Sequence, residues 1–227
     1  MNLHVHRIRH ERATLWRVAV ALVVALGMWV GILLTIATPR AGASTSSKAT
    51  ITTVPFATPS GVTLAEAPPP WPLPVDARPY IAAAGLEALG QEQLAVHYHA
   101  HLDVIANGKP VSVPPGIGFV IVNSRATALT ELHTHDASGI VHIESAQDKP
   151  YSLGQVFTEW GVALNAKQVG GLKADSTNAL RVYVNGRRFQ GDPAGIVLKP
   201  HQEIALWYGP ASEKPKVPKS YRFPRGL

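Results

Sequence analysis

The apolar residues of the chain fall into one long uninterrupted run and a later region of short alternating segments. Residues 18–37 (VAVALVVALGMWVGILLTIA) contain no charged side chain. As a helix, about 20 apolar residues span the hydrocarbon core of a bilayer. From residue 96 onward, apolar and polar residues alternate over short stretches, which is typical of strands that cover a core with one face. The pattern predicts a transmembrane signal-anchor helix over residues 18–38, followed by a β-rich domain.

The orientation of the anchor follows from its flanking charges. Arg7, Arg9, Arg12 and Arg17 precede the run, and basic residues favour the cytoplasmic side. We therefore expect a cytoplasmic N-terminus over residues 1–17, a single pass through the cell membrane and an extracytoplasmic C-terminal domain. A cleaved signal peptide is the alternative, because residues 41–43 (Ala-Gly-Ala) match a small-x-small cleavage site.

Three regions follow the anchor. Residues 39–75 contain eight prolines among many Thr, Ser and Ala residues, which predicts an extended stalk. Residues 76–210 are long enough to form a self-sufficient folded domain. Residues 211–227 form a basic, proline-rich tail. We interpret this tail as a solvated end, with contact to anionic lipid or a protein partner as the alternative.

Turn signals within residues 76–210 predict several hairpins. The alternating segment 96–104 leads into Asn107-Gly108, a dipeptide that favours a two-residue type I′ turn and would place Val104 opposite Val111. The same dipeptide recurs at residues 185–186, and a last strand is predicted over residues 203–208.

Two helices complete the expected fold. An Ala- and Leu-rich pattern predicts one over residues 79–94, and Ser152 with Gln155 forms a capping box at the start of another. These elements predict an α+β fold, namely a small antiparallel β-rich domain, sandwich-like or barrel-like, with two short helices.

Histidines are concentrated on the alternating segments. His97, His99 and His101 alternate with apolar residues, so they share one face of a strand with Asp103. The opposite face, with residues such as Leu102, is the expected core side.

A second hairpin around residues 136–139 groups further histidines. If its loop has an even length, Leu132 lies opposite Ile143 and His133 opposite His142. His133, His135, His142 and Glu144 then share one face, and Glu131 lies opposite Glu144.

Alternating histidines on neighbouring strands are a common way to bind a transition metal ion. The candidate ligands are His97, His99, His101, His133, His135 and His142. Ligation by nitrogen without thiolates suits copper or zinc. Asp103, Asp136, Glu131 and Glu144 are candidates to orient the imidazole N–H groups. Alternatively, the histidines only cover the solvated face of a sheet, and Asp136 only starts a turn. We do not expect His201 to be a ligand, because it lies in a turn-like segment.

Composition and charge exclude several other classes of protein. The chain contains no Cys, which excludes disulfide frameworks, cysteine-ligated zinc fingers and iron–sulfur clusters. Residues 76–210 carry ten basic and twelve acidic side chains. A slightly acidic domain lacks the basic surface that nucleic-acid binding requires, so we expect no nucleic-acid partner.

Two resemblances rest on these motifs. The segments HxHxHLxV (97–104), LHTHDxSGxxHIE (132–144) and SLGxxxxEWG (152–161) resemble an uncharacterised family of membrane-anchored or secreted actinobacterial and archaeal proteins. That resemblance covers about residues 80–209 and implies an extracytoplasmic, His-rich β domain. The spacing of His97, His99 and His133, with Glu131 nearby, is also similar to the zinc site of α-class carbonic anhydrases. There, two histidines alternate on one strand and a third comes from its neighbour.

The sequence therefore predicts a membrane-tethered, extracytoplasmic metal-binding protein that captures copper or zinc, delivers it to a membrane complex or acts as an accessory subunit of one. A metal-dependent enzyme with a three-histidine site, a hydrolase, lyase or redox enzyme, is the alternative. A structural subunit without a metal is a third reading.

Overall fold

The computed structural model describes residues 50–227, which belong to one compact unit. None of the helices in this part of the chain is long and apolar enough to cross a membrane. The expected cytoplasmic segment, the transmembrane helix over residues 18–38 and the cleavage motif at residues 41–43 lie outside the described residues.

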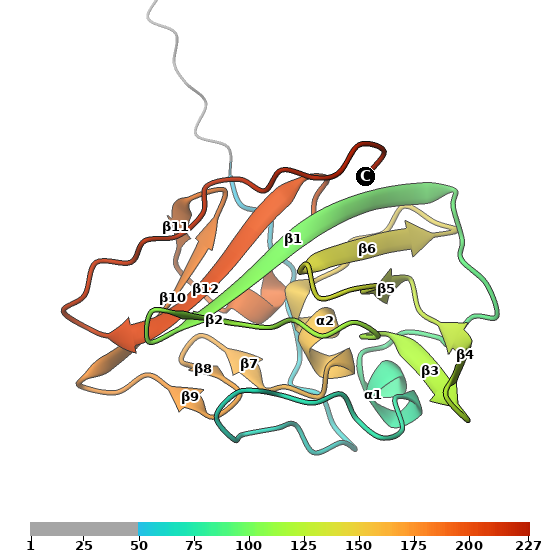
Figure 1. Cartoon of the computed structure of the whole chain (residues 1–227), viewed down its shortest axis with the longest axis horizontal. Coiled ribbons are helices and arrows are strands. Elements are labelled where there is room, and N and C mark those ends of the chain that lie inside the picture. Colours follow the sequence, from blue (N-terminus) through green and yellow to red (C-terminus); the bar gives the residue numbers. More distant parts are fainter. Residues whose placement is uncertain (1–49) are drawn as a thin grey trace, which may run out of the picture. The chain divides into compact units, whose positions relative to one another are not determined.

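A mixed seven-stranded sheet forms the centre of the domain (Figure 1). Its strand order is β11-β10-β12-β1-β6-β5, and β2 pairs with β1. The strands are β1 (Val96–Ala106), β2 (Lys109–Val111), β5 (Leu132–His133), β6 (Ile140–Ser145), β10 (Asn178–Val184), β11 (Arg187–Phe189) and β12 (Gln202–Pro210). The prediction of a purely antiparallel sheet is wrong for one pair, because β1 and β12 run parallel. The path ends at β11 and β5, so this sheet is open rather than closed into a barrel.

Smaller elements surround the main sheet. They are the hairpin β3 (Phe119–Val122) and β4 (Arg125–Leu129), the three-stranded β7 (Leu164–Asn165), β8 (Gln168–Val169) and β9 (Leu172–Lys173), the helices α1 (Arg78–Ala83) and α2 (Leu153–Glu159), and a 3₁₀ turn, η1 (Pro193–Gly195). The domain is therefore β-rich with two short helices.

Both Asn-Gly hairpins are confirmed. Val104 pairs with Val111 across the first turn, and Val184 pairs with Arg187 across the second. Asn107 and Asn185 have φ angles of 50° and 51°, and the glycines that follow them also have positive φ. A type I′ turn requires positive φ at both central residues, and Asn-Gly tolerates this conformation best.

The two helices differ in how well the sequence predicted them. The capping box of α2 is confirmed, since Ser152 and Gln155 each accept a hydrogen bond from the other's backbone N–H. The helix α1 ends at Ala83, well before the predicted end at residue 94. Gly85 follows with φ +68°, the left-handed conformation that commonly terminates a helix.

The expected stalk differs from the structure over its described part, residues 50–75. The backbone N–H of Ala65 donates to Gly161, and Val54 donates to Gly195. The side chain of Trp71 is only 3% exposed and packs edge-to-face on Trp160, with ring centroids 5.6 Å apart. The Trp160 indole N–H donates to the carbonyl of Trp71. Apolar anchors and backbone hydrogen bonds thus offset the ordering entropy of a proline-rich segment. Residues 50–75 are therefore part of the folded domain.

The C-terminal tail also lies against the domain (Figure 1). The ring of Tyr221 stacks on that of His101 with centroids 3.6 Å apart, and Phe223 contacts His201. The large apolar side chains of the tail (Val217, Tyr221, Phe223 and Leu227) are half-buried, whereas its basic residues are exposed. The tail is therefore not simply a solvated end, because its aromatic side chains cover part of the sheet.

The packing of residues 50–75 makes a direct prediction. Replacing a large buried aromatic side chain by Ala typically costs about 3–5 kcal/mol, so Trp71→Ala is expected to lower the free energy of unfolding by that amount. The measurement is urea unfolding monitored by circular dichroism. Val75→Ala is the control, because Val75 is fully exposed and its replacement should stay within about 0.5 kcal/mol. Equal stability of the two variants would show that the segment is a free stalk.

Candidate functional site

Strand register brings three imidazoles into one row across the sheet. His99 on β1 pairs with His142 on β6, and His142 pairs with His133 on β5. Directly paired residues on neighbouring strands project to the same face. The predicted pairing of His133 with His142 is confirmed. However, β6 lies between β1 and β5, so the strand next to β1 supplies His142 rather than His133. The histidine on the strand next to His97 and His99 is therefore His142, not His133 as the carbonic-anhydrase-like spacing implied.

The next row contributes a carboxylate. His97 pairs with Glu144, and the backbone N–H of Glu144 donates to the carbonyl of Glu131. His135 follows β5 on the same face, and its ring lies 4.5 Å from that of His142. We refer to His97, His99, His133, His135, His142 and Glu144 as the histidine cluster.

Ligand atoms in the histidine cluster approach one another closely. His99 Nε2 lies 3.1 Å from His97 Nε2 and 3.1 Å from His142 Nδ1. Glu144 Oε1 lies 3.3 Å from both His97 Nε2 and His142 Nδ1. Two ligands of one zinc ion lie at most about 4.2 Å apart, because each metal–ligand distance is about 2.1 Å. These contacts all lie within that limit.

The histidine cluster has a buried interior and an exposed rim. His133 is 0% exposed and Glu144 is 4% exposed, whereas the side chains of His97 and His135 are 39% and 45% exposed. The alternative in which these histidines only cover a solvated face does not describe His99, His133 and Glu144, which are buried. Phe119 of β3 packs against the part of the cluster next to β5, since its ring contacts those of His133 and His135.

The hydrogen bonds of His133 determine its tautomer. Its Nδ1 lies 2.9 Å from the carbonyl oxygen of Thr130. A carbonyl only accepts, so Nδ1 carries the proton and Nε2 presents a lone pair. Nε2 has no hydrogen-bond partner among the described residues, and neither has Glu144 Oε2, which lies 3.8 Å away. Two buried acceptors that face each other are costly unless a cation or a shared proton lies between them.

Burial keeps the inner imidazoles neutral. Burial, reinforced by the neighbouring histidines, lowers the pKa of His99 to about 4 and that of His142 to about 3. Burial likewise lowers the pKa of His133 to about 4, against the opposing effect of the Thr130 hydrogen bond. Burial raises the pKa of Glu144. Neutral imidazole is the form that binds metal, so the imidazoles of His99, His133 and His142 are in the ligating state at neutral pH.

His101 lies in a separate pair rather than in the histidine cluster. On β6 its partner is Ile140, whereas on β12 its partner is Glu203. Its Nδ1 lies 2.7 Å from Glu203 Oε2, and its Nε2–H donates to the carbonyl of Ser138 at 2.8 Å. Burial opposes protonation of His101, but the hydrogen bond and charge of Glu203 raise its pKa overall. Both ring nitrogens are thus engaged, although His101, Asp103 and Glu203 form a third group of metal-ligand geometry.

The other predicted carboxylates have local roles. Asp136 Oδ1 accepts the backbone N–H of Ser138, which makes it the start of an Asx turn. Glu131 Oε1 accepts from Lys149 at 3.0 Å. Asp103 lies 3.8 Å from His101 Nδ1. Of the four proposed orienting residues, only Glu144 contacts several imidazoles of the histidine cluster. His201 belongs to none of the groups with metal-ligand geometry among the described residues.

Sequence reasoning missed three acidic residues, two of which lie beside histidines and one of which is buried in α2. Glu203 contacts His101 through the parallel pairing of β1 with β12, which no local pattern reveals. Glu92 lies 3.8 Å from His135 Nε2. Glu159 of α2 is 1% exposed, and neither carboxyl oxygen has a hydrogen-bond partner among the described residues. Burial raises the pKa of Glu159 well above its usual range, which favours the protonated form of this carboxyl.

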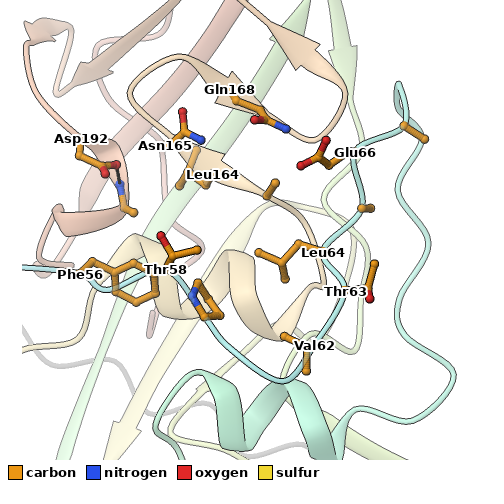
Figure 2. Close-up of a pocket in the computed structure, with 15 residues that line it drawn as sticks. Phe56, Thr58, Val62, Thr63, Leu64, Glu66, Leu164, Asn165, Gln168 and Asp192 are labelled. Carbon is orange, nitrogen blue, oxygen red and sulfur yellow. Dashed lines mark hydrogen bonds between the residues drawn. The ribbon is translucent and has the colours of Figure 1, made fainter.

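A pocket elsewhere on the domain contains none of these groups. Figure 2 shows it between residues 56–67 and the β7–β8 hairpin, with Asp192 at one side. Its volume is about 790 Å³, and its lining mixes apolar side chains with Glu66, Asn165 and Gln168. It shares no residue with the histidine cluster.

The lowered pKa values predict unusual titration of the metal-free chain. At pH 5.5 an imidazole with the ordinary pKa of about 6.5 is roughly nine-tenths protonated, whereas His99, His133 and His142 are expected to stay neutral. Between pH 6.5 and 4 these three histidines bind more protons in the unfolded state than in the folded state. Each of the three histidines therefore makes the free energy of unfolding smaller as the pH falls through this range. The measurement is the ¹⁵N chemical shift of each imidazole during an NMR titration. Ordinary titration of His133 near pH 6.5 would contradict the buried geometry.

Comparison of the chain with protein-family models, with curated proteins and with solved structures found no match. Its interpretation therefore depends on the geometry of its own residues, which form buried groups of His and Glu side chains able to hold a metal ion.

Proposed function

We propose that this protein is a membrane-tethered, extracytoplasmic metal-binding protein that holds copper or zinc in the histidine cluster. The observation that carries the proposal is the buried lone pair of His133 Nε2, which faces the unpaired Glu144 Oε2 at 3.8 Å. A buried imidazole lone pair beside a buried carboxylate oxygen is costly unless a cation or a shared proton lies between them, and a metal ion would satisfy both atoms.

The donor set supports a first-row transition metal. The histidine cluster offers imidazole nitrogens and one carboxylate, and the chain has no thiolate. Imidazole suits zinc and copper, and copper binds more tightly than zinc at a given site of nitrogen and oxygen donors. Oxygen-seeking ions such as magnesium and calcium fit this set poorly.

The half-exposed rim supports metal capture and transfer. His97 on β1 and His135 just after β5 are both partly exposed, so an incoming carrier or a partner in a membrane complex has access to the ligands. Anchoring by the apolar run of residues 18–38 would keep the domain near such a partner.

A metal-dependent enzyme is the second candidate. One observation favours it, namely that the side chain of His135, which belongs to one group with His133 and Glu144, is 45% exposed, so water would have access to a metal held there. A metal-bound water at such a position can act as a nucleophile. Turnover of bicarbonate, simple esters or superoxide by the metal-loaded chain would favour this candidate over metal transfer.

The proposal predicts tight metal binding that depends on specific histidines. The full chain is expected to bind Zn²⁺ or Cu²⁺ stoichiometrically, as measured by isothermal titration calorimetry and by metal analysis after dialysis. His99→Ala and His133→Ala should each weaken binding by about a hundredfold, because each removes a direct ligand. His97→Ala is a third variant. Because the side chain of His97 is partly exposed, this variant still tests the site if His99→Ala or His133→Ala does not fold.

Two controls make the result specific. His201→Ala changes a nearby histidine outside the histidine cluster and is expected to alter affinity by less than about twofold. All variants are compared in a chain whose His4, His6 and His10 are replaced by Ala, so that imidazoles of the N-terminal segment do not contribute. Absence of binding, or equal weakening by His201→Ala and His99→Ala, would refute the metal site.

A further inference from the structure

We propose that the histidine cluster binds two metal ions rather than one, with the carboxylate of Glu144 as the bridge between them. This inference rests on the proposed function and deepens it. The cluster contains two overlapping groups with metal-ligand geometry. Each has four residues whose ligand atoms lie within 4.8 Å of one another, and Glu144 and His142 belong to both.

The first ion is held on the β1 side of β6. Its ligands are His97 Nε2, His99 Nε2, His142 Nδ1 and Glu144 Oε1. The neighbouring pairs of this set are separated by 3.1–3.3 Å. Three nitrogens and one oxygen at this spacing form a complete four-coordinate site.

The second ion is held on the β5 side of β6. His133 Nε2 and Glu144 Oε2 lie 3.8 Å apart, and neither has another partner among the described residues. His135 is the third ligand, and its ring lies 4.8 Å from that of His133. This site has three protein ligands and an open position on its exposed side.

A single ion leaves part of this arrangement unexplained. The ring of His142 stands between the two sets, since it contacts His99 on one side and His135 on the other. An ion among His97, His99 and His142 uses Glu144 Oε1 and leaves the buried His133 Nε2 and Glu144 Oε2 unpaired. An ion beside His133 leaves the close contacts among the other three imidazoles without a cation.

Bridging by one carboxylate also suits the geometry and the charge. The two oxygens of Glu144 face different imidazoles, and carboxylate-containing two-metal sites commonly hold their ions about 3.5–4 Å apart. Glu92, 3.8 Å from His135, adds negative charge beside the second ion.

Copper provides the test, because two Cu²⁺ ions at this spacing couple magnetically. The full chain with His4, His6 and His10 replaced is loaded with Cu²⁺, dialysed, and examined by metal analysis and electron paramagnetic resonance. We expect two Cu²⁺ per chain, with a resonance signal weaker than that of two isolated Cu²⁺ ions and with a half-field transition.

His97→Ala and His135→Ala form a matched pair at the exposed rim, and each should reduce the content to one Cu²⁺ per chain with a normal, uncoupled signal. Glu144→Gln should abolish the coupling, and His201→Ala should leave both ions in place.

Each other outcome has a distinct meaning. One Cu²⁺ per chain, weakened alike by His97→Ala and His135→Ala, would overturn the two-ion site and leave the proposed function intact. Two uncoupled ions would overturn the Glu144 bridge. Two ions that survive both rim substitutions would place the metal elsewhere and overturn the inference. No bound copper or zinc would overturn the proposed function itself.

Discussion

The pairing of β1 with β6 is the constraint on which the site depends. This register sets His99 opposite His142 and His97 opposite Glu144. The pairing of β6 with β5 then extends the row to His133. Because side chains alternate between the two faces of a strand, a shift by one residue would move every imidazole of that strand to the opposite face. The apolar residues on the other face of β1, such as Leu102 and Val104, are buried in the core. Packing of the core therefore fixes the position of the imidazoles.

Burial gives these side chains their chemical character. His133 is enclosed, its Nδ1 proton is held by the Thr130 carbonyl, and its Nε2 lone pair is directed toward Glu144. His101 is equally buried, but a carboxylate and a carbonyl engage both of its nitrogens. The two histidines of the same sheet thus differ in what their ring nitrogens can bind. His133 is neutral and has a free lone pair on Nε2, whereas His101 takes part in a hydrogen-bonded pair with Glu203.

Segments with little regular structure complete the domain on both sides of the sheet. Residues 50–75 bring Trp71 against Trp160 in the core. The C-terminal tail places Tyr221 on the ring of His101. Neither segment shows a period of helix or strand, and composition alone suggests an unpacked chain in both cases. Aromatic side chains with matching partners, together with backbone hydrogen bonds in residues 50–75, hold them against the domain, and composition does not reveal such partners.

Local patterns in the sequence determined the Asn-Gly hairpins, the capping box of α2 and the pairing of His133 with His142. Each depends on residues close together in the chain, where turn chemistry and alternation are decisive. Only the tertiary structure decided that β6 lies between the two histidine strands, that β12 runs parallel to β1, and that His101 meets Glu203 rather than the histidine cluster. These features depend on contacts between residues about forty to a hundred positions apart, and the order of strands in a sheet leaves no trace in local periodicity.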